Sequence, residues 1–494
     1  MLSFDVRGTV LDGPSTELLG LSHVEFIYVA GAWSVVAASE AEGALTTFEF
    51  SNNLLGSVQD EQGYTSTSGT RTVWDLTTLD MNGVTYVLPA TRYEDQTNFY
   101  SIGNGGTLGA GINPNGLGEL SLNTALSVGG NTFVYTVGAN GAGINVYGVD
   151  ASLNFTMVDQ VADTGQTYLG DVSAFASATV GGVEYLFVAS AYDAGISSYA
   201  VASDGTLTLT DTVAPNEFSG FWQVQDLIAM EVGGQTFVVM ASAGTSSLTV
   251  YSVAANGDLV ETDHLIDSHD TRFQNASVLE TFEYDGRSFV IAAGSDDGIT
   301  VLELMGSGTL WEHASLADTY DITLANVTSI SAEVINGTVE ILISSATDHG
   351  FTHVTLDTSQ LDSAITGTDQ DDFLQGSSSA DVIYGLDGDD HLVGRGGADI
   401  IVDGAGRDYL TGDGGRDVFM FVEDGEPDVI VDYGVGFDQI DLSQFANVNG
   451  MNDLAISDWC GGVIIIANQD ILIIQNQDNR TYEASEFGIS DFLF

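Results

Sequence analysis

The chain of 494 residues contains no lysine and only nine basic residues, all arginine, against 70 acidic residues, so its formal net charge is −61. Nucleic-acid binding needs basic side chains that neutralise phosphates, and this composition therefore excludes a nucleic-acid partner. Adhesion to anionic membranes through basic patches is disfavoured for the same reason. The excess negative charge must be solvated or neutralised, and divalent cations are suitable counterions.

Three other features that are rare or absent in the sequence exclude further structural classes. The single cysteine, Cys460, excludes an internal disulfide framework, and its apolar surroundings (DWCGGVIIIA) predict a buried small residue rather than a nucleophile. No apolar run reaches about 18 residues, so no membrane-spanning helix is expected. The first residues lack a basic segment followed by an apolar run, so we expect no cleaved export signal there.

Glycine is abundant, with 59 residues, and 44% of the residues are hydrophobic, which favours a β-rich core over an acidic disordered chain. One unit recurs over residues 1–357: a glycine turn followed by a short hydrophobic strand such as VEYLFVAS or QTFVVMAS. The turn glycines stand at intervals near 50 residues: Gly31, Gly83, Gly130, Gly182, Gly234, Gly286 and Gly337.

A period near 50 with about four short strands is typical of a β-propeller blade, so residues 1–357 are predicted to form one seven-bladed propeller. A β-solenoid or a string of sandwiches fits less well, because solenoid coils are shorter and sandwiches need more strands. The seventh unit ends one strand short. We predict that Leu2–Val10 supplies its outer strand and closes the ring. In repeat length and strand pattern this region resembles lactonase-like propellers, which implies a fold but no particular chemistry.

Residues 367–420 consist of six consecutive nonapeptides, with aspartate at position six and an apolar residue at position eight of each. This pattern predicts a calcium-binding parallel β-roll over residues 358–420. Two nonapeptides form one turn, so loops stack on both edges and their carboxylates and carbonyls surround about four calcium ions. An acidic linker would not need an apolar residue in every unit. The predicted metal ligands are Asp369, Asp372, Asp381, Asp387, Asp390, Asp399, Asp408 and Asp417.

The array departs from the pattern in two places. The unit GSSSAD lacks two of the usual glycines, and the fifth unit begins with Asp403 instead of glycine. We therefore expect the outer sites to be weaker or incomplete.

The nonapeptides resemble the repeats-in-toxin family. That resemblance implies export of the unfolded chain through a type I secretion channel, directed by an uncleaved C-terminal signal. Residues 421–494, which end in ISDFLF, would form a β-rich cap that carries this signal. The predicted location is secreted, either extracellular or on the cell surface.

No catalytic motif is evident, because the seven histidines lack metal-binding spacing and no G-x-S-x-G sequence occurs. By symmetry, the residues nine positions before each turn glycine should line the propeller channel: Ser22, Trp74, Ser121, Ser173, Gln225, Ser277 and Thr328. With neighbouring residues and the two longest polar connections, they give the candidate ligand-binding set His23, Trp74, Asp75, Arg92, Gln225, Asp226, His269 and Arg272.

Two functional hypotheses remain. In the first, the protein is a secreted calcium-binding protein whose propeller binds a glycan or a surface partner. In the second, it is a secreted hydrolase or lyase acting on an ester, lactone or polysaccharide in the propeller mouth. A close cluster such as His23 with Asp75, or His269 with Arg272, would favour the second hypothesis. The arginines could equally form structural ion pairs.

Overall fold

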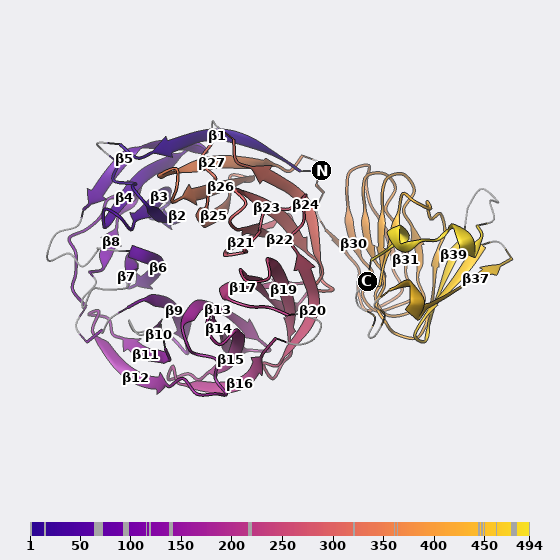
Figure 1. Ribbon diagram of the computed structural model, residues 1–494, viewed down its shortest axis with the longest axis horizontal. Coiled ribbons are helices and arrows are strands. Elements are labelled where there is room, and N and C mark those ends of the chain that lie inside the picture. The colour runs from indigo at the N-terminus through magenta and orange to yellow at the C-terminus, as the bar shows by residue number, and fades with distance from the viewer. Residues whose placement is uncertain are drawn as a thin grey trace. The chain divides into compact units, whose positions relative to one another are not determined.

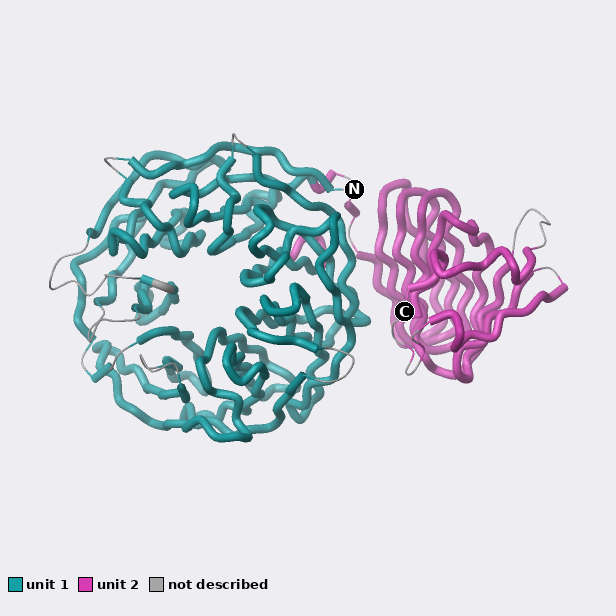
Figure 2. The backbone as a smooth tube through the Cα atoms, in the orientation of Figure 1, with its two compact units in different colours: residues 1–282, 288–357 teal, residues 283–287, 358–494 magenta. Residues whose placement is uncertain are grey.

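The computed structural model divides the chain into two compact units, one of Met1–Phe282 with Ser288–Asp357 and one of Glu283–Arg287 with Thr358–Phe494 (Figure 2). Apart from four three-residue 3-10 turns, the described elements are strands, and no described helix is long and apolar enough to cross a membrane. The structure describes residues 2–13, 16–63, 73–91, 98–114, 116–117, 120–137, 142–215, 220–319, 322–359, 361–362, 364–442, 445, 448, 450–460, 462–475 and 482–493.

The first unit is a seven-bladed β-propeller (Figure 1). Each blade is an antiparallel sheet whose first strand lies nearest the central axis. Blades one to three contain β2 (Leu21–Val29), β3 (Ala32–Ser39), β4 (Ala44–Ser51) and β5 (Leu54–Gln62); β6 (Val73–Met81), β7 (Val84–Thr91) and β8 (Tyr100–Ile102), followed by η1 (Asn104–Gly106); and β9 (Leu122–Val128), β10 (Asn131–Val137), β11 (Ile144–Val149) and β12 (Phe155–Val161).

Blades four to seven follow the same order. They contain β13 (Val172–Val180), β14 (Val183–Ser190), β15 (Gly195–Val201) and β16 (Leu207–Val213); β17 (Val224–Val232), β18 (Gln235–Ser242), β19 (Ser247–Val253) and β20 (Leu259–Ile266); β21 (Val278–Tyr284), β22 (Arg287–Ala293), β23 (Gly298–Leu304) and β24 (Leu310–Ala317); and β25 (Val327–Ile335), β26 (Thr338–Ser345), β27 (Gly350–Asp357) and β1 (Ser3–Leu11).

The repeat pattern correctly predicted the turns and the closing strand. All seven turn glycines have φ between 76° and 87°, a left-handed conformation that favours glycine. The N-terminal strand β1 pairs antiparallel with β27, from Ser3 opposite Asp357 to Leu11 opposite Gly350. Blade two is the exception to four strands, because its described residues form three strands followed by an isolated bridge between Ile102 and Leu108.

Acidic side chains join the outer strands of neighbouring blades. At a bulge in β16, Asp211 Oδ1 accepts the N–H of Thr212 and Oδ2 accepts the N–H of Leu259 in the next blade, both at 2.8 Å. Because each carboxylate satisfies two backbone donors, these acids need no basic partner. The same contact, in which a leucine N–H donates to the Oδ2 atom of an outer-strand aspartate, recurs at 2.8–2.9 Å in three more pairs: Leu108 with Asp60, Leu207 with Asp159 and Leu310 with Asp263.

The second unit is a β-roll of two sheets, with a 3-10 turn η2 (Met451–Asp453) before its terminal hairpin. One sheet is parallel and consists of β28 (Ile365–Thr366), β30 (Val382–Tyr384), β32 (Ile400–Val402), β34 (Val418–Met420), β36 (Gln439–Asp441) and β40 (Phe492–Leu493). The other contains β29 (Phe373–Gln375), β31 (His391–Val393), β33 (Tyr409–Thr411), β35 (Pro427–Ile430), β39 (Asp470–Gln475), β38 (Gly462–Ala467) and β37 (Leu454–Trp459), the last three antiparallel.

Successive strands within each sheet of the roll lie 18 residues apart in the array, so two nonapeptides form one turn. The position-eight residues face inward and are fully buried at Ile383, Leu392, Ile401, Leu410 and Phe419. The chain end then caps the core: after the turns η3 (Ala484–Glu486) and η4 (Ile489–Asp491), β40 pairs with β36.

The prediction of a buried Cys460 is wrong. The residue is exposed, because it lies in the tight turn between β37 and β38 instead of inside a strand. The apolar residues after it, including Val463 and Ile465, are the ones that face the core.

Candidate functional site

The position-six aspartates form two hydrogen-bonded ladders, one on each edge of the roll. On the first edge, the N–H of Asp372 donates to Asp390 Oδ1 at 2.8 Å, and the N–H of Asp390 donates to Asp408 Oδ1 at 2.7 Å. On the second edge, Asp381 donates to Asp399 at 2.9 Å and Asp399 donates to Asp417 at 3.0 Å. Each carboxylate thus fixes the loop of the preceding turn.

Both ladders continue beyond the nonapeptide array. The N–H of Asp408 donates to Asp428 Oδ1 at 3.0 Å, and the N–H of Asp417 donates to Asp438 Oδ1 at 3.1 Å. Neither residue is among the ligands predicted from the sequence, because the spacing lengthens from 18 to 20 and 21 residues after the last regular unit. Searching for aspartate before each later short strand would have found them.

The central ladder carboxylates are buried and incompletely bonded. Asp390, Asp399 and Asp408 are at most 1% exposed, and the Oδ2 atom of each has no hydrogen-bond partner. Burial raises the pKa of Asp399 to about 6 and that of Asp408 to about 7, with neighbouring aspartates adding to both shifts. Such oxygens need a cation or a proton, since an unpaired buried charge is costly.

The predicted ligands differ in their surroundings. Asp381 and Asp417 are each 1% exposed, whereas Asp372 is only partly buried. Asp369 and Asp387 are exposed on the loops and contribute no rung to the ladders. Oxygen-only donors, orphaned inner carboxylate oxygens and closely stacked loops fit a hard cation such as Ca²⁺. The buried position-six aspartates would hold it together with loop carbonyl groups, and the ion would supply positive charge to the edges of the roll.

The propeller encloses a cavity of about 770 Å³ around its axis. Several ring hydroxyls serve structure there, since Ser22 Oγ donates to Val73 O and Ser173 Oγ donates to Val224 O of the next blade, each at 2.8 Å. Gln225 has only a long contact of 3.5 Å with Gln223 O. Six of the seven ring residues chosen by symmetry line the cavity: Ser22, Ser121, Ser173, Gln225, Ser277 and Thr328.

Five carboxyl groups on the inner strands have raised pKa values, chiefly because they are buried: Glu25, Asp75, Asp226, Glu280 and Glu333. Burial, with smaller contributions from neighbouring acids that include Glu333, raises the pKa of Glu25 and of Glu280 to about 8. Burial likewise raises the pKa of Asp75 and of Asp226 to about 7. Each aspartate also accepts backbone N–H groups, including that of Leu279 at 2.8 Å from Asp226 Oδ2.

His23 is the only basic side chain among the described residues that line the cavity. Its Nδ1 lies 3.9 Å from Asp75 Oδ1 and its Nε2 lies 3.9 Å from Glu25 Oε2. Burial lowers the pKa of His23 to about 4, so the ring is neutral at pH 7. The structure therefore brings His23 close to Asp75, although neither distance is that of a hydrogen bond.

The remaining candidates do not join this cluster. His269 is exposed and Arg272 is partly buried, and neither lines the cavity. The positive charge of Arg272 acts instead on Asp296, whose pKa is raised chiefly by burial and lowered in part by this arginine. The side chain of Trp74 and all of Arg92 lie outside the described residues.

We expect the propeller to lose stability as pH rises from 6.5 to 8 in the presence of a chelator. The folded state retains protons on Glu25 and Glu280, with pKa values of about 8, that the unfolded chain has already released. The loss is about 1 kcal/mol per pH unit for each carboxyl still protonated in the folded state. His23 gives a smaller slope of opposite sign near pH 6.5, because the unfolded histidine is still partly protonated there while the folded ring is neutral; this contribution vanishes toward pH 8.

Calorimetry of the propeller transition at several pH values measures this slope. Glu280→Gln should flatten it, whereas Glu231→Gln, which changes an exposed acid of β17, should not. Stability that is constant or rises between pH 6.5 and 8 would contradict the prediction.

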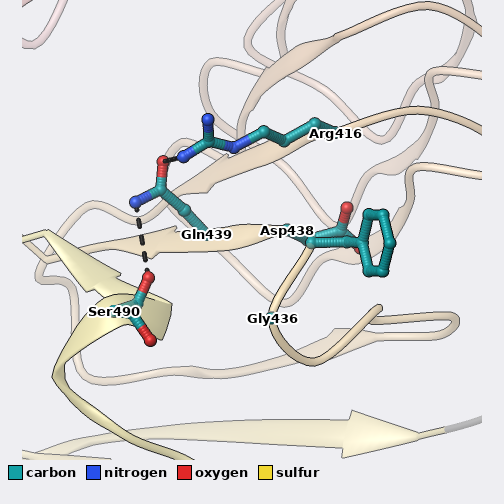
Figure 3. A pocket seen from close by; sticks show the side chains of 6 residues that line it. Arg416, Gly436, Asp438, Gln439 and Ser490 are labelled. Atoms are coloured by element: carbon teal, nitrogen blue, oxygen red, sulfur yellow. Dashed lines mark hydrogen bonds between the residues drawn. The ribbon is translucent and has the colours of Figure 1, made fainter.

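A smaller hollow of about 250 Å³ lies in the roll beside its C-terminal cap (Figure 3). Its polar groups already bind one another: Arg416 donates to Gln439 Oε1 at 3.0 Å, and Gln439 Nε2 reaches Ser490 O at 3.5 Å. These contacts tie the chain end to the roll. The lining residues are Arg416, Gly436, Phe437, Asp438, Gln439 and Ser490.

Comparison with known protein families supports the assignment of the nonapeptides to calcium-binding repeats. The family model of the RTX calcium-binding nonapeptide repeat, in four copies, matches residues 366–401 and 393–421. No curated protein matches the chain.

Solved structures resemble the propeller at low identity. A provisionally assigned 6-phosphogluconolactonase from Bacteroides uniformis ATCC 8492 is 15% identical, with a TM-score of 0.45, over 63% of this chain and 88% of that one. The Dos1 propeller is 9% identical, with a TM-score of 0.44, over 68% and 78%. A protein from Lactobacillus plantarum is 12% identical, with a TM-score of 0.41, over 62% and 89%.

The chain is thus an acidic all-β protein that combines a seven-bladed propeller with a β-roll of RTX calcium-binding repeats.

Proposed function

We propose that this is a secreted calcium-binding protein whose roll folds on calcium after export and whose propeller binds an extracellular ligand. The observation that carries the first part is the pair of aspartate ladders, in which the central carboxylates are buried with Oδ2 unpartnered. Low calcium inside the cell would leave the roll unfolded and fit for a type I channel. Extracellular calcium would then stabilise the folded roll by mass action.

For the propeller we propose a glycan or another ligand rich in hydrogen-bond donors. The serine hydroxyls Ser22 and Ser173 already donate to the backbone, so carboxyl oxygens are the main free polar atoms of the cavity, and protonated Glu280 adds one donor. Its acids disfavour anionic ligands, phosphorylated sugars included.

A glycan screen with neutral, amino and uronic sugars tests the ligand proposal. Neutral or amino sugars should bind, and Gln225→Ala should weaken that binding because Gln225 lines the cavity with its amide almost free. The control Gln59→Ala changes an exposed amide on the outer strand β5. Selective binding of uronic sugars, or equal binding by wild type and Gln225→Ala, would count against this site.

One observation favours a second candidate, a hydrolase or lyase with its site in the cavity. Neutral His23 beside carboxyls whose pKa values lie near 7 and 8 could exchange protons near neutral pH. Turnover of ester, lactone or polysaccharide substrates that disappears in His23→Ala, while ligand binding persists, would establish this alternative.

Export has its own test. Deleting Ile489–Phe494 in a host with a type I channel should keep the protein inside the cell, because the proposed export signal lies at this end. Secretion of the truncated chain at the wild-type level would contradict the proposal. Replacing the exposed Glu426 by Gln provides a control that leaves the chain end intact.

A further inference from the structure

The fifth nonapeptide differs from the other five at position one, where Asp403 replaces glycine. In other units of the array, position one faces the position-six carboxylate of the same loop. A Cβ added to Gly376 would lie 2.5 Å from Asp381 Oδ2, and one added to Gly385 would lie 2.5 Å from Asp390 Oδ2. Only in the fifth unit is this place taken by a side chain, and that side chain is a second carboxylate.

Asp403 is buried beside two ladder aspartates. It is 1% exposed, while Asp408 and Asp428 are 0% and 2% exposed. One carboxylate oxygen from each of the three lies within 4.8 Å of the other two. Three buried carboxylates therefore meet at this point of the roll.

The backbone satisfies only part of this cluster. Asp403 Oδ1 accepts the N–H groups of Gly404 at 2.6 Å and Val422 at 3.0 Å, and Asp428 Oδ1 accepts the N–H of Asp408. Asp403 Oδ2 and Asp408 Oδ2 have no partner. Two buried, unpartnered carboxylate oxygens beside a third carboxylate need either a proton or a cation between them, and a cation can neutralise all three groups at once.

We propose that Asp403, Asp408 and Asp428 bind a hard divalent cation in a site made of three carboxylates, and that this site holds calcium more tightly than the loop sites of the regular repeats. The inference rests on the proposed calcium binding of the roll. Its basis is charge, because calcium affinity increases with the number of anionic ligands in a site. The departure from the repeat pattern at Asp403 then creates the strongest site of the array.

The test measures calcium bound to the full-length chain by native mass spectrometry and by competition with chelators of graded affinity. Wild type should retain one calcium ion after the others have been removed. In Asp403→Gly, which restores the glycine of the other units, the tightest affinity should fall by about tenfold or more. Asp403→Asn preserves size and should show the same fall. Glu426→Gln, which removes an exposed charge two residues from Asp428, should behave as wild type.

The outcomes separate this inference from the proposed function. Wild type that binds no calcium overturns both. Calcium binding with the same ion count and the same tightest affinity in wild type, Asp403→Gly and Asp403→Asn overturns the three-carboxylate site alone. Circular dichroism in saturating calcium identifies a variant that has lost its fold, and the other variant then decides.

Discussion

Removing calcium from the full-length protein is expected to unfold the roll while leaving the propeller folded. Residues 367–420 contain 12 Asp and 3 Arg, and the roll buries its position-six carboxylates between stacked loops. Without a cation these like charges repel in a poorly solvated gap. Each of these nonapeptides contributes its position-eight residue to the core of the roll, and a few flanking strand residues such as Val382 and Ile400 are also buried. We expect this burial to be too small to offset the chain entropy of the loops.

Limited proteolysis in a chelator, compared with proteolysis in millimolar calcium, measures this effect. Cleavage should begin after residue 357 only in the chelator and should leave a resistant propeller fragment. Magnesium should protect poorly, because its smaller octahedral shell suits these flexible loops less well. Equal protection by magnesium, or a roll that resists proteolysis without any cation, would contradict the mechanism.

The loss of calcium-dependent protection should be larger for variants of buried ladder aspartates than for variants of partly exposed ones. Asp390→Ala combined with Asp399→Ala removes a central carboxylate from each edge and should abolish the calcium-dependent protection. Asp372→Ala should shift the calcium midpoint only modestly, because Asp372 is partly exposed at the first turn. An equal effect of Asp372→Ala would show that position along the roll does not matter.

Deleting residues 1–11 should destabilise the propeller by on the order of 5 kcal/mol, since net backbone hydrogen bonds contribute about 1 kcal/mol each. The deletion removes β1, which pairs with β27 along its whole length. Apolar burial adds to the loss through Leu2, which is 4% exposed, and Val10, which packs against a buried core, whereas Val6 and Leu11 are 42% and 56% exposed. The exposed edge of β27 should also promote aggregation.

Denaturant unfolding of the deletion variant in the presence of calcium measures the loss. Arg7→Ala is the matched control, because Arg7 lies at the bulge of β1 and pairs only with Asp5 on the surface. Unfolding midpoints that coincide for wild type and the deletion variant would show that the ring does not depend on this strand.

Periodic features of this protein could be predicted from the sequence, and features that depend on contacts between repeats could not. The turn glycines and the ring positions followed from a constant repeat length, because equal spacing places equivalent residues at equivalent points of the ring. Glu25 and Glu280 both lie six residues before their turn glycines, and Glu333 lies four before Gly337. They were missed because the repeat length gives no sign that they interact once the ring closes.

The same distinction holds for the roll. A nine-residue count identifies Asp390 and Asp399 but stops before Asp428 and Asp438, where insertions change the spacing while the hydrogen bond persists. Asp403 appeared as an irregular residue, because sequence spacing gives no sign that it lies against Asp408 and Asp428.

The aspartates that join neighbouring blades bear on how this protein responds to salt. Their bonds to backbone N–H groups, such as Asp211 to Leu259, are short and partly buried, so dissolved ions screen them weakly. The ion pairs between described residues involve only Arg7 or a histidine, so screening has few attractive pairs to weaken. It acts mainly on the repulsion among surface acids. A rise in ionic strength is therefore expected to weaken this repulsion while leaving the aspartate bonds between blades in place.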